Sequence, residues 1–394
     1  MVNTWTYYLF TTITVIVYWV IPHSWRAYLL TLAGFLYFGS YYPREILLLL
    51  VTALVVYLWG LVITKRPGRW LLAAGVLLAA GNLAYFKYRP LLVETYNWFA
   101  SWKGLTVNPG IHKIVVPLGI SYFTFKMIHY LVDLHRGHIE RHRAIDFFNY
   151  IFFFPILTAG PIERFQPFLA QSQNIYGFEM DNLYQGLPRI IVGLFKKIVL
   201  ADTLAIWAVN LNSPDLTAGQ YWWAMYAYTF QIYFDFSGYT DMALGVSRLF
   251  GYRIMENFDW PYLSRDVSEF WKRWHMSLTG WLRDYVFIPL GGSRGQLSTT
   301  IRNTFIVMAV TGIWHGAAWH FLAWGLYHAA GLTGLRLYRR CVYPKLSRRL
   351  RFLQFPAVVP VNVLLTFHYV AVGWIFFACN TRQSLHVIAA MLGL

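Results

Sequence analysis

The histidines that lie in apolar stretches of this chain are the side chains best suited to move a proton. His315, His320 and His328 lie within one apolar segment, and His275 lies in an aromatic segment upstream. An imidazole has a usual pKa of about 6.5, so near neutral pH it can take a proton from a hydroxyl and return it to a leaving group. These four residues are therefore the first candidates for general acid–base chemistry.

His315 differs from the other histidines because Gly312 and Gly316 flank it in TGIWHGAAWH. Small residues allow a second backbone or a substrate chain to approach closely, and the sequence leaves both possibilities open. A histidine in a membrane helix can also serve packing alone, which is the alternative for His320 and His328. Their spacings do not follow the i, i+3 or i, i+4 rule for metal ligands on one helix, and we expect no metal.

The aromatic segment reads DVSEFWKRWHMSLTGWLRDYVFIPLGG, from Asp266 to Gly292. Helical spacing predicts one apolar stripe with Lys272, Arg273 and His275 on or beside the opposite face. Such a segment cannot cross hydrocarbon alone. It should lie at the interface or enter the membrane against protein or an aqueous cavity. The stripe consists of Trp271, Trp274, Leu278, Trp281 and Leu282.

Two carboxylates interrupt a third apolar run, QIYFDFSGYTDMALGVSRLFGY, at Asp235 and Asp241. Ionisable residues at membrane depth are costly, so they tend to mark functional positions. The alternative is a polar break in a helix, with the carboxylates paired to arginine or tryptophan N–H groups. The sequence favours neither reading.

Composition requires a membrane for these segments. Hydrophobic residues make up 57% of the 394 residues and charged residues only 13%, about half the share in soluble domains. The 18 tryptophans and 28 tyrosines suit membrane–water boundaries. The formal net charge of +16 fits basic cytoplasmic loops, or a charge that also attracts an anionic donor or headgroup, rather than nucleic acid.

The apolar stretches predict an all-α polytopic membrane protein with about ten or eleven transmembrane or re-entrant helices. The segment from Asp146 to Thr158 is short enough to enter the membrane without crossing it. The longer candidates are Thr4–Ile21, Ala27–Tyr42, Ile46–Thr64, Trp70–Tyr88, Ile114–Leu134, Leu187–Val209, Gln220–Tyr233, Asn303–Trp314, Ala317–Leu337 and Phe355–Cys379.

Basic clusters predict the orientation. The loop expected from Arg336 to Arg351 contains seven Lys or Arg residues and no acidic residue, and Lys65–Arg69 is a smaller cluster, so we place both on the cytoplasmic side.

The two cysteines, Cys341 and Cys379, indicate neither disulfides nor a metal, and Cys341 should be a free thiol. The first apolar stretch reads as a retained anchor. The half-length segment before Leu394 suggests a short variant or further natural chain.

Six motifs follow one another along the chain: SYFTFKMIHYLVDLHRG, FFFPILTAGPIERF, FDFSGYTDMA, ENFDWPYLS, EFWKRWHMSLTGWLRDYVFIPLGG and GIWHGAAWHFLAWGLYH. In this order they resemble the membrane-bound O-acyltransferase family, and specifically its bacterial polysaccharide O-acetyltransferase branch. The resemblance covers roughly residues 110 to 380. We expect one integral membrane domain, 1–394, with N-terminal helices at 1–110 and a catalytic core at 111–380.

The resemblance implies a funnel-like membrane domain with its active site deep in the bilayer. His315 corresponds to the family's W-H-G histidine, and His275 corresponds to the second polar catalytic position. We expect His315 to act as the base, and His275 to orient the acceptor or donor or to donate a hydrogen bond to the oxyanion. The remaining candidates for substrate binding and for shaping the tunnel are Asp235, Trp274, Trp281, Arg283, Asp284 and Trp314.

The same resemblance implies the partners and the location. The donor should be an acyl thioester, with acetyl-CoA as co-substrate beside basic residues such as Lys196 and Lys197, and no cofactor should be bound. The acceptor should be an extracytoplasmic polysaccharide, or a periplasmic acyltransferase or esterase-like partner protein that delivers the acyl group. The protein should be multi-pass in the bacterial cytoplasmic (inner) membrane, in contact with the lipid bilayer and not with nucleic acid.

Three alternatives make different predictions. An acyltransferase could instead use teichoic acid, a lipid or a protein as its acceptor. A transporter would also contain intramembrane histidines and aspartates, but it should show two halves with matching interrupted helices, and we see no such symmetry. A non-enzymatic scaffold would leave His275 and His315 without a role.

Overall fold

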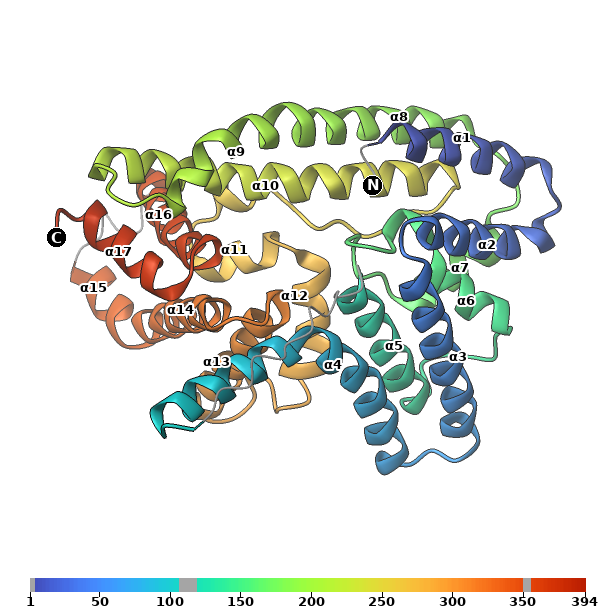
Figure 1. The fold of residues 1–394 in the computed structure, drawn as a ribbon, viewed down its shortest axis with the longest axis horizontal. Coiled ribbons are helices and arrows are strands. Elements are labelled where there is room, and N and C mark those ends of the chain that lie inside the picture. The colour runs from blue at the N-terminus through green and yellow to red at the C-terminus, as the bar shows by residue number, and fades with distance from the viewer. Residues whose placement is uncertain (1–3, 106–118, 350–355) are drawn as a thin grey trace. The chain divides into compact units, whose positions relative to one another are not determined.

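The computed structural model describes residues 4–105, 119–349 and 356–394 (Figure 1). Within these residues the regular structure is helical, apart from one isolated antiparallel bridge between Phe258 and Trp274. The predicted all-α class is confirmed. The chain forms two compact units: unit 1 contains Met1–Leu194 and Tyr239–Met255, and unit 2 contains Phe195–Gly238 and Glu256–Leu394. The grouping of the whole chain as one integral domain stays a prediction.

Unit 1 is built around a core of aromatic and aliphatic side chains, among them Leu49, Tyr130 and Phe147, all fully buried. Its first helix begins after Thr4, whose hydroxyl accepts the backbone N–H of Tyr7. The helices are α1 (Trp5–Val20), α2 (His23–Tyr41), α3 (Pro43–Lys65), α4 (Arg69–Trp102), α5 (Ile120–His135), α6 (Ala144–Phe152), α7 (Phe165–Asn174) and α8 (Met180–Leu194).

Two ion pairs join α8 to the end of α10 (Ala218–Leu249) inside unit 1. The guanidinium of Arg189 lies 2.9 Å from the Asp241 carboxylate, and Arg248 lies 2.7 Å from Asp181. Asp241 is therefore paired with an arginine, as the structural alternative for this run expected. The helix break in that same alternative is wrong, because α10 continues without interruption past Asp241.

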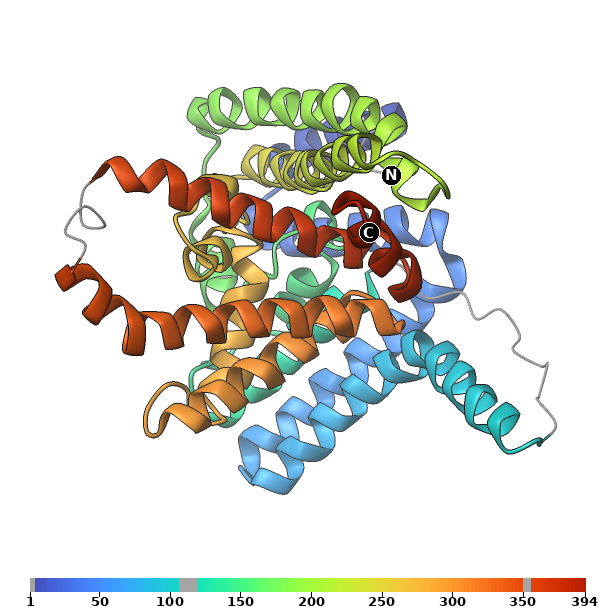
Figure 2. The ribbon, with the colours of Figure 1, turned by 90° about the vertical axis from the view of Figure 1, so that its left-hand side faces the viewer.

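Unit 2 contains the first part of α10 and the later helices. Figure 2 shows α13, α14 and α16 side by side in that order, in agreement with their contacts. The helices are α9 (Asp202–Ala208), α11 (Val267–Arg273), α12 (Met276–Leu282), α13 (Leu297–His315), α14 (Trp319–Leu337), α15 (Tyr343–Arg349), α16 (Val359–Ala378) and α17 (Thr381–Met391).

Glycines set the close packing of α13 on α14. A Cβ atom placed on Gly325 would overlap with the carbonyl oxygen of Met308, and one on Gly312 would overlap with the carbonyl oxygen of Phe321. Gly312 therefore admits a second backbone, which is one of the two roles left open by the sequence. The same contact fixes the end of α13, where His315 lies.

Three helical stretches of the described residues are long and apolar enough to cross a bilayer: Pro43–Lys65, Arg69–Arg89 and Val359–Ala378. Helix α1 is apolar but shorter. These stretches agree with a polytopic membrane protein, and the larger number of ten or eleven segments stays a prediction. The first residues of the expected span Ile114–Leu134, together with Arg351 and Phe355, lie outside the described residues.

The prediction of one continuous helix through the aromatic segment is wrong. Helix α11 ends at Arg273 and α12 begins at Met276, because residues 257–259 pair with the chain between them. The N–H of Asp259 donates to the carbonyl of Arg273, and the N–H of Met276 donates to that of Asn257. The five Trp and Leu residues of the predicted stripe are nevertheless all buried.

The expected basic loop after α14 is also helical as far as the structure describes it, to Arg349. A π-helical turn, Tyr338–Val342, leads directly into α15, so Arg339 and Arg340 lie on a helix rather than on an extended loop. Cys341 is a free, exposed cysteine on this turn. A second π-helical stretch, Phe195–Ala201, joins α8 to α9 and carries Lys197.

Candidate active site

His275 and His315, the two predicted catalytic histidines, both contact the indole ring of Trp314. The ring centre of Trp314 lies 5.9 Å from that of His275 and 4.7 Å from that of His315. His315 is the last residue of α13, and His275 lies between α11 and α12, so unit 2 supplies both. The structure therefore brings three of the predicted site residues together.

The imidazole of His315 is surrounded by aromatic rings but is not closed off. It also packs edge-on against Trp324 and Phe377, with ring centres 5.1 Å and 5.0 Å away. His315 is only partly buried, whereas His275 is 1% exposed. His315 is therefore the more exposed imidazole of the pair.

His275 is held in one orientation by its neighbours. Its Nδ1 lies 3.2 Å from the side-chain oxygen of Asn257, and the ring of Phe236 meets the imidazole edge-on at 4.7 Å. Its Nε2 is buried and has no hydrogen-bond partner among the described residues. The placement of His275 on the polar face of a helix was wrong, because the backbone turns at this residue with a φ of 44°.

The other predicted site residues lie around this centre in different settings. Trp274 is part of a buried aromatic cluster, stacked on Phe270 and 4.8 Å from Trp374 between ring centres. Trp281 lies 5.0 Å from Tyr285 between ring centres.

Arg283 and Asp284 form an ion pair of 2.9 Å with each other. Asp235 pairs with Lys197 at 2.6 Å, and the same ammonium group lies 2.8 Å from Asp202. Lys197 is therefore engaged by two carboxylates, which argues against the expected donor site beside it.

The two remaining histidines of the W-H-G segment serve packing. His320 Nδ1 lies 2.9 Å from the carbonyl oxygen of Phe376. His328 is fully buried in a box of aromatic rings that includes Trp271 and Trp324, and neither of its ring nitrogens has a hydrogen-bond partner among the described residues. Within the described ranges, no group of three or more His, Cys, Asp or Glu side chains is arranged to hold a metal.

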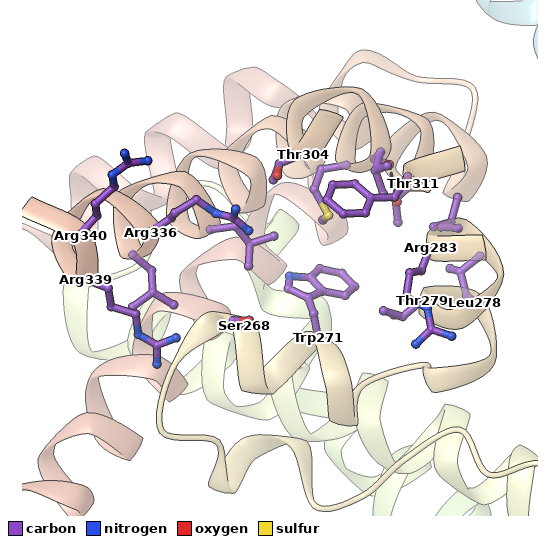
Figure 3. Close-up of a pocket in the computed structure, with 16 residues that line it drawn as sticks. Ser268, Trp271, Leu278, Thr279, Arg283, Thr304, Thr311, Arg336, Arg339 and Arg340 are labelled. Atoms are coloured by element: carbon purple, nitrogen blue, oxygen red, sulfur yellow. Dashed lines mark hydrogen bonds between the residues drawn. The ribbon is translucent and has the colours of Figure 1, made fainter. Parts of the chain in front are cut away.

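Unit 2 contains an apolar pocket of about 560 Å³ (Figure 3), lined by residues that lie near the two histidines in sequence but not by the histidines themselves. Its walls include Thr311, one turn before His315, and Leu278 and Thr279, just after His275. The indole of Trp271 projects into its middle. Arginines stand at its ends: Arg283 at one, and Arg336, Arg339 and Arg340 at the other.

A wider and more polar pocket of about 1140 Å³ adjoins the first. Both pockets are lined by Ser268, Leu335 and Arg339, so they meet at these residues. The guanidinium of Arg339 lies 2.7 Å from the Asp266 carboxylate at this junction. The charged residues of the wider pocket are Asp259, Arg265, Asp266, Glu269, Lys272, Arg273 and Arg339.

Sequence reasoning missed two features of this site. Asn257 lies in the quoted motif ENFDWPYLS, yet nothing in the sequence places it against His275, which follows 18 residues later. Arg336, Arg339 and Arg340 were interpreted only as markers of the cytoplasmic side. A run of arginines continuing from an apolar helix could have indicated the mouth of a pocket.

Comparisons with known proteins identify the family. The model of the membrane-bound O-acyltransferase family matches residues 35–376. The chain is 37% identical to a probable alginate O-acetylase of Pseudomonas aeruginosa, over 95% of this chain and 71% of that protein. It is 32% identical to a peptidoglycan O-acetyltransferase of Helicobacter pylori, over 82% and 65% of the two chains. It is 31% identical to a teichoic acid D-alanyltransferase of Bacillus subtilis, over 68% and 70%. These matches place the chain in the membrane-bound O-acyltransferase family.

Proposed function

We propose that this membrane O-acyltransferase transfers an acetyl group from a thioester to hydroxyls of an extracytoplasmic polysaccharide, directly or through a partner protein. The observation that carries the proposal is the pair of histidines on Trp314, of which His315 is partly exposed. An apolar pocket lined by Thr311 and Leu278, which lie near them in sequence, suits a thioester arm. The alginate and peptidoglycan O-acetyltransferases among its relatives support a polysaccharide acceptor.

His315 acts as the general base in this proposal. As the acceptor oxygen attacks the thioester carbonyl, the hydroxyl proton passes to the imidazole of His315. The carbon–sulfur bond then breaks, and the leaving thiolate takes the proton back, so that an ester and a free thiol result. Because His315 is partly exposed and is held by the rings of Trp314, Trp324 and Phe377, it can meet a hydroxyl in a fixed orientation.

The two adjoining pockets suit acetyl-CoA as the donor. The apolar pocket would take the pantetheine arm, and the wider charged pocket would take the nucleotide phosphates. Lys272 lines the wider pocket, and Arg336 and Arg340 line the apolar pocket at the end where Arg339 joins the two. These three cations form no ion pair with another described residue, so they are available to phosphate oxygens at the junction. These cations lie on or beside the helix predicted to face the cytoplasm, where such a donor is made available.

The side of the membrane from which the acceptor approaches follows from the cytoplasmic position of the donor pockets. With the donor pockets on the cytoplasmic side of a bacterial inner membrane, the acceptor would approach the histidines from the opposite side. A sugar hydroxyl, or a hydroxyl of a periplasmic acyltransferase or esterase-like protein, would then receive the acetyl group. No acyl carrier would have to cross the membrane.

Turnover of acetyl-CoA tests the proposal directly. In lipid nanodiscs, the purified protein should release CoA from radiolabelled acetyl-CoA and move the label to de-acetylated alginate oligosaccharides. The assay is repeated with a carrier-protein thioester as the donor. If the folded protein then produces neither labelled oligosaccharide nor labelled free acetate from either donor, the proposal is contradicted.

The charged pocket predicts a donor preference. Lys272→Ala should raise KM for acetyl-CoA about tenfold, equivalent to about 1.4 kcal/mol, because one charge-assisted contact to phosphate is lost. KM for acetyl-pantetheine, which lacks the nucleotide and its phosphates, should not change. Lys345→Ala is the matched control, since Lys345 is exposed on α15 and lines neither pocket. If Lys272→Ala changed KM equally for acetyl-CoA and acetyl-pantetheine, the phosphates of acetyl-CoA would not bind at Lys272.

A further inference from the structure

The side chain of Asn257 is fully buried and presents its oxygen to three donors. The hydroxyl of Ser277 donates to this oxygen at 2.6 Å and the backbone N–H of Ser277 at 3.4 Å, while Nδ1 of His275 lies 3.2 Å away. A backbone N–H can only donate, so the atom that faces it must be the amide oxygen rather than the amide nitrogen. The backbone N–H of Ser277 therefore fixes the orientation of the Asn257 amide, independently of His275.

This orientation fixes the tautomer of His275. Since the Asn257 oxygen can only accept, Nδ1 of His275 must carry the hydrogen of the neutral imidazole. The lone pair then lies on Nε2, the nitrogen that is buried without a partner among the described residues. A buried acceptor without a donor is unfavourable, so a hydrogen bond from a bound group to Nε2 would stabilise this arrangement.

We infer that Asn257 is a positioning residue that holds His275 with its Nε2 lone pair directed at the acceptor, where it accepts a hydrogen bond from an acceptor hydroxyl. The inference rests on the proposed function and deepens it. One of the roles expected for His275 was to donate a hydrogen bond to the oxyanion. The inference excludes this role for the neutral imidazole, because the ring presents no N–H toward the substrate.

The surroundings of His275 favour the acceptor over the donor as the bonding group. The donor pocket is lined by Trp271, Leu278 and Thr279, which flank His275 in sequence, but not by His275 itself. The imidazole instead meets Phe236 of α10 and Trp314. His275 thus lies off the pocket that suits the thioester arm.

The inference also limits the chemical class of the acceptor to molecules with two neighbouring hydroxyls. In the proposed reaction, the proton of the attacking hydroxyl passes to His315. The hydroxyl that His275 holds is therefore a second one. An acceptor with neighbouring hydroxyls, such as a sugar ring, satisfies both histidines, whereas a single serine hydroxyl satisfies only one.

The backbone at His275 is consistent with a residue held for function. Its φ of 44° lies in the left-handed region, which is unfavourable for a residue with a side chain. The hydrogen bond from the N–H of Met276 to the carbonyl of Asn257 supports this turn. Asn257 therefore fixes both the backbone and the imidazole of His275.

The test uses the full chain in nanodiscs and two readouts. The first is nitrogen NMR of ¹⁵N-labelled histidine, with the His275 signal assigned by its loss in His275→Phe. The second is the ratio of the two products formed from acetyl-CoA: free acetate, from hydrolysis by water, and acetylated alginate oligosaccharide, from transfer. The variants are Asn257→Leu, which removes the acceptor oxygen, and Asn257→Asp, which keeps it. Ser277→Ala, which leaves the Asn257–His275 contact in place, is the control.

We expect a Nδ1-protonated His275 in the wild type, in Asn257→Asp and in Ser277→Ala, and a shift of the tautomer in Asn257→Leu. Asn257→Leu should raise KM for the oligosaccharide at least tenfold while thioester hydrolysis by water stays unchanged. A Nε2-protonated His275 in the wild type, or equal losses of hydrolysis and transfer in Asn257→Leu, would overturn the inference. If the wild type turns over no thioester, the proposed function fails, and the NMR tautomer alone decides the positioning by Asn257.

Discussion

Replacement of His315 by alanine should lower acetyl transfer by about 10²–10⁴-fold while the protein remains folded. The imidazole is the accessible member of the histidine pair, and no other histidine of the W-H-G segment is positioned to replace it. His315→Gln should lose as much, because an amide keeps the hydrogen bonding but cannot take the proton. Release of CoA from acetyl-CoA in nanodiscs measures both variants.

His328→Phe is the matched control for this prediction. His328 is fully buried among aromatic rings, and its nitrogens have no hydrogen-bond partner in the described part of the chain. A phenyl ring of similar shape removes two unsatisfied polar atoms, so activity should persist and thermal stability should stay equal or rise. Full activity in His315→Ala, with His328→Phe also active, would show that His315 is not the base.

Substitution of Gly325 by leucine should destabilise the protein by at least about 3 kcal/mol or prevent its recovery in folded form. The reason is steric, because the first side-chain atom would already overlap with the carbonyl oxygen of Met308. Helices α13 and α14 would have to separate, and the end of α13 with His315 would move. Thermal unfolding in detergent, followed by size-exclusion chromatography, measures the effect.

Gly334→Ala on the same helix provides the comparison. No atom lies within 4 Å of a Cβ placed there, and alanine favours a helix over glycine by about 1 kcal/mol. This variant should match or exceed the wild type in stability. A Gly325→Leu protein as stable as Gly334→Ala would mean that the two backbones are not in close contact.

The sequence predicted best what depends on short-range patterns. The apolar runs located helices α1, α3 and α16 within a few residues, because about twenty apolar residues in a row permit few other structures in a membrane protein. The pair His275 and His315 came from motif resemblance, and the structure places both on Trp314. Their chemical roles stay predictions.

Long-range pairing could not be predicted in the same way. Helical periodicity treated the segment around His275 as continuous, but residues 257–259 compete for its backbone hydrogen bonds and break it. Asp235 and Asp241 looked equivalent in sequence. In the structure, one pairs with Lys197 in unit 2 and the other with Arg189 in unit 1, a difference set by tertiary contacts alone.

The interleaving of the two units constrains how the chain can be made. Unit 1 remains incomplete on the ribosome until Met255 has emerged, because Asp241 and Arg248 supply the partners of Arg189 and Asp181. By then the segment Phe195–Gly238 of unit 2 already exists, without the residues that follow Met255. Cutting the gene after Leu194 would therefore leave the first fragment without residues 239–255 of its own unit, while the second fragment would carry all of unit 2. The first fragment expressed alone should not fold, because Arg189 and Asp181 would lack their partners.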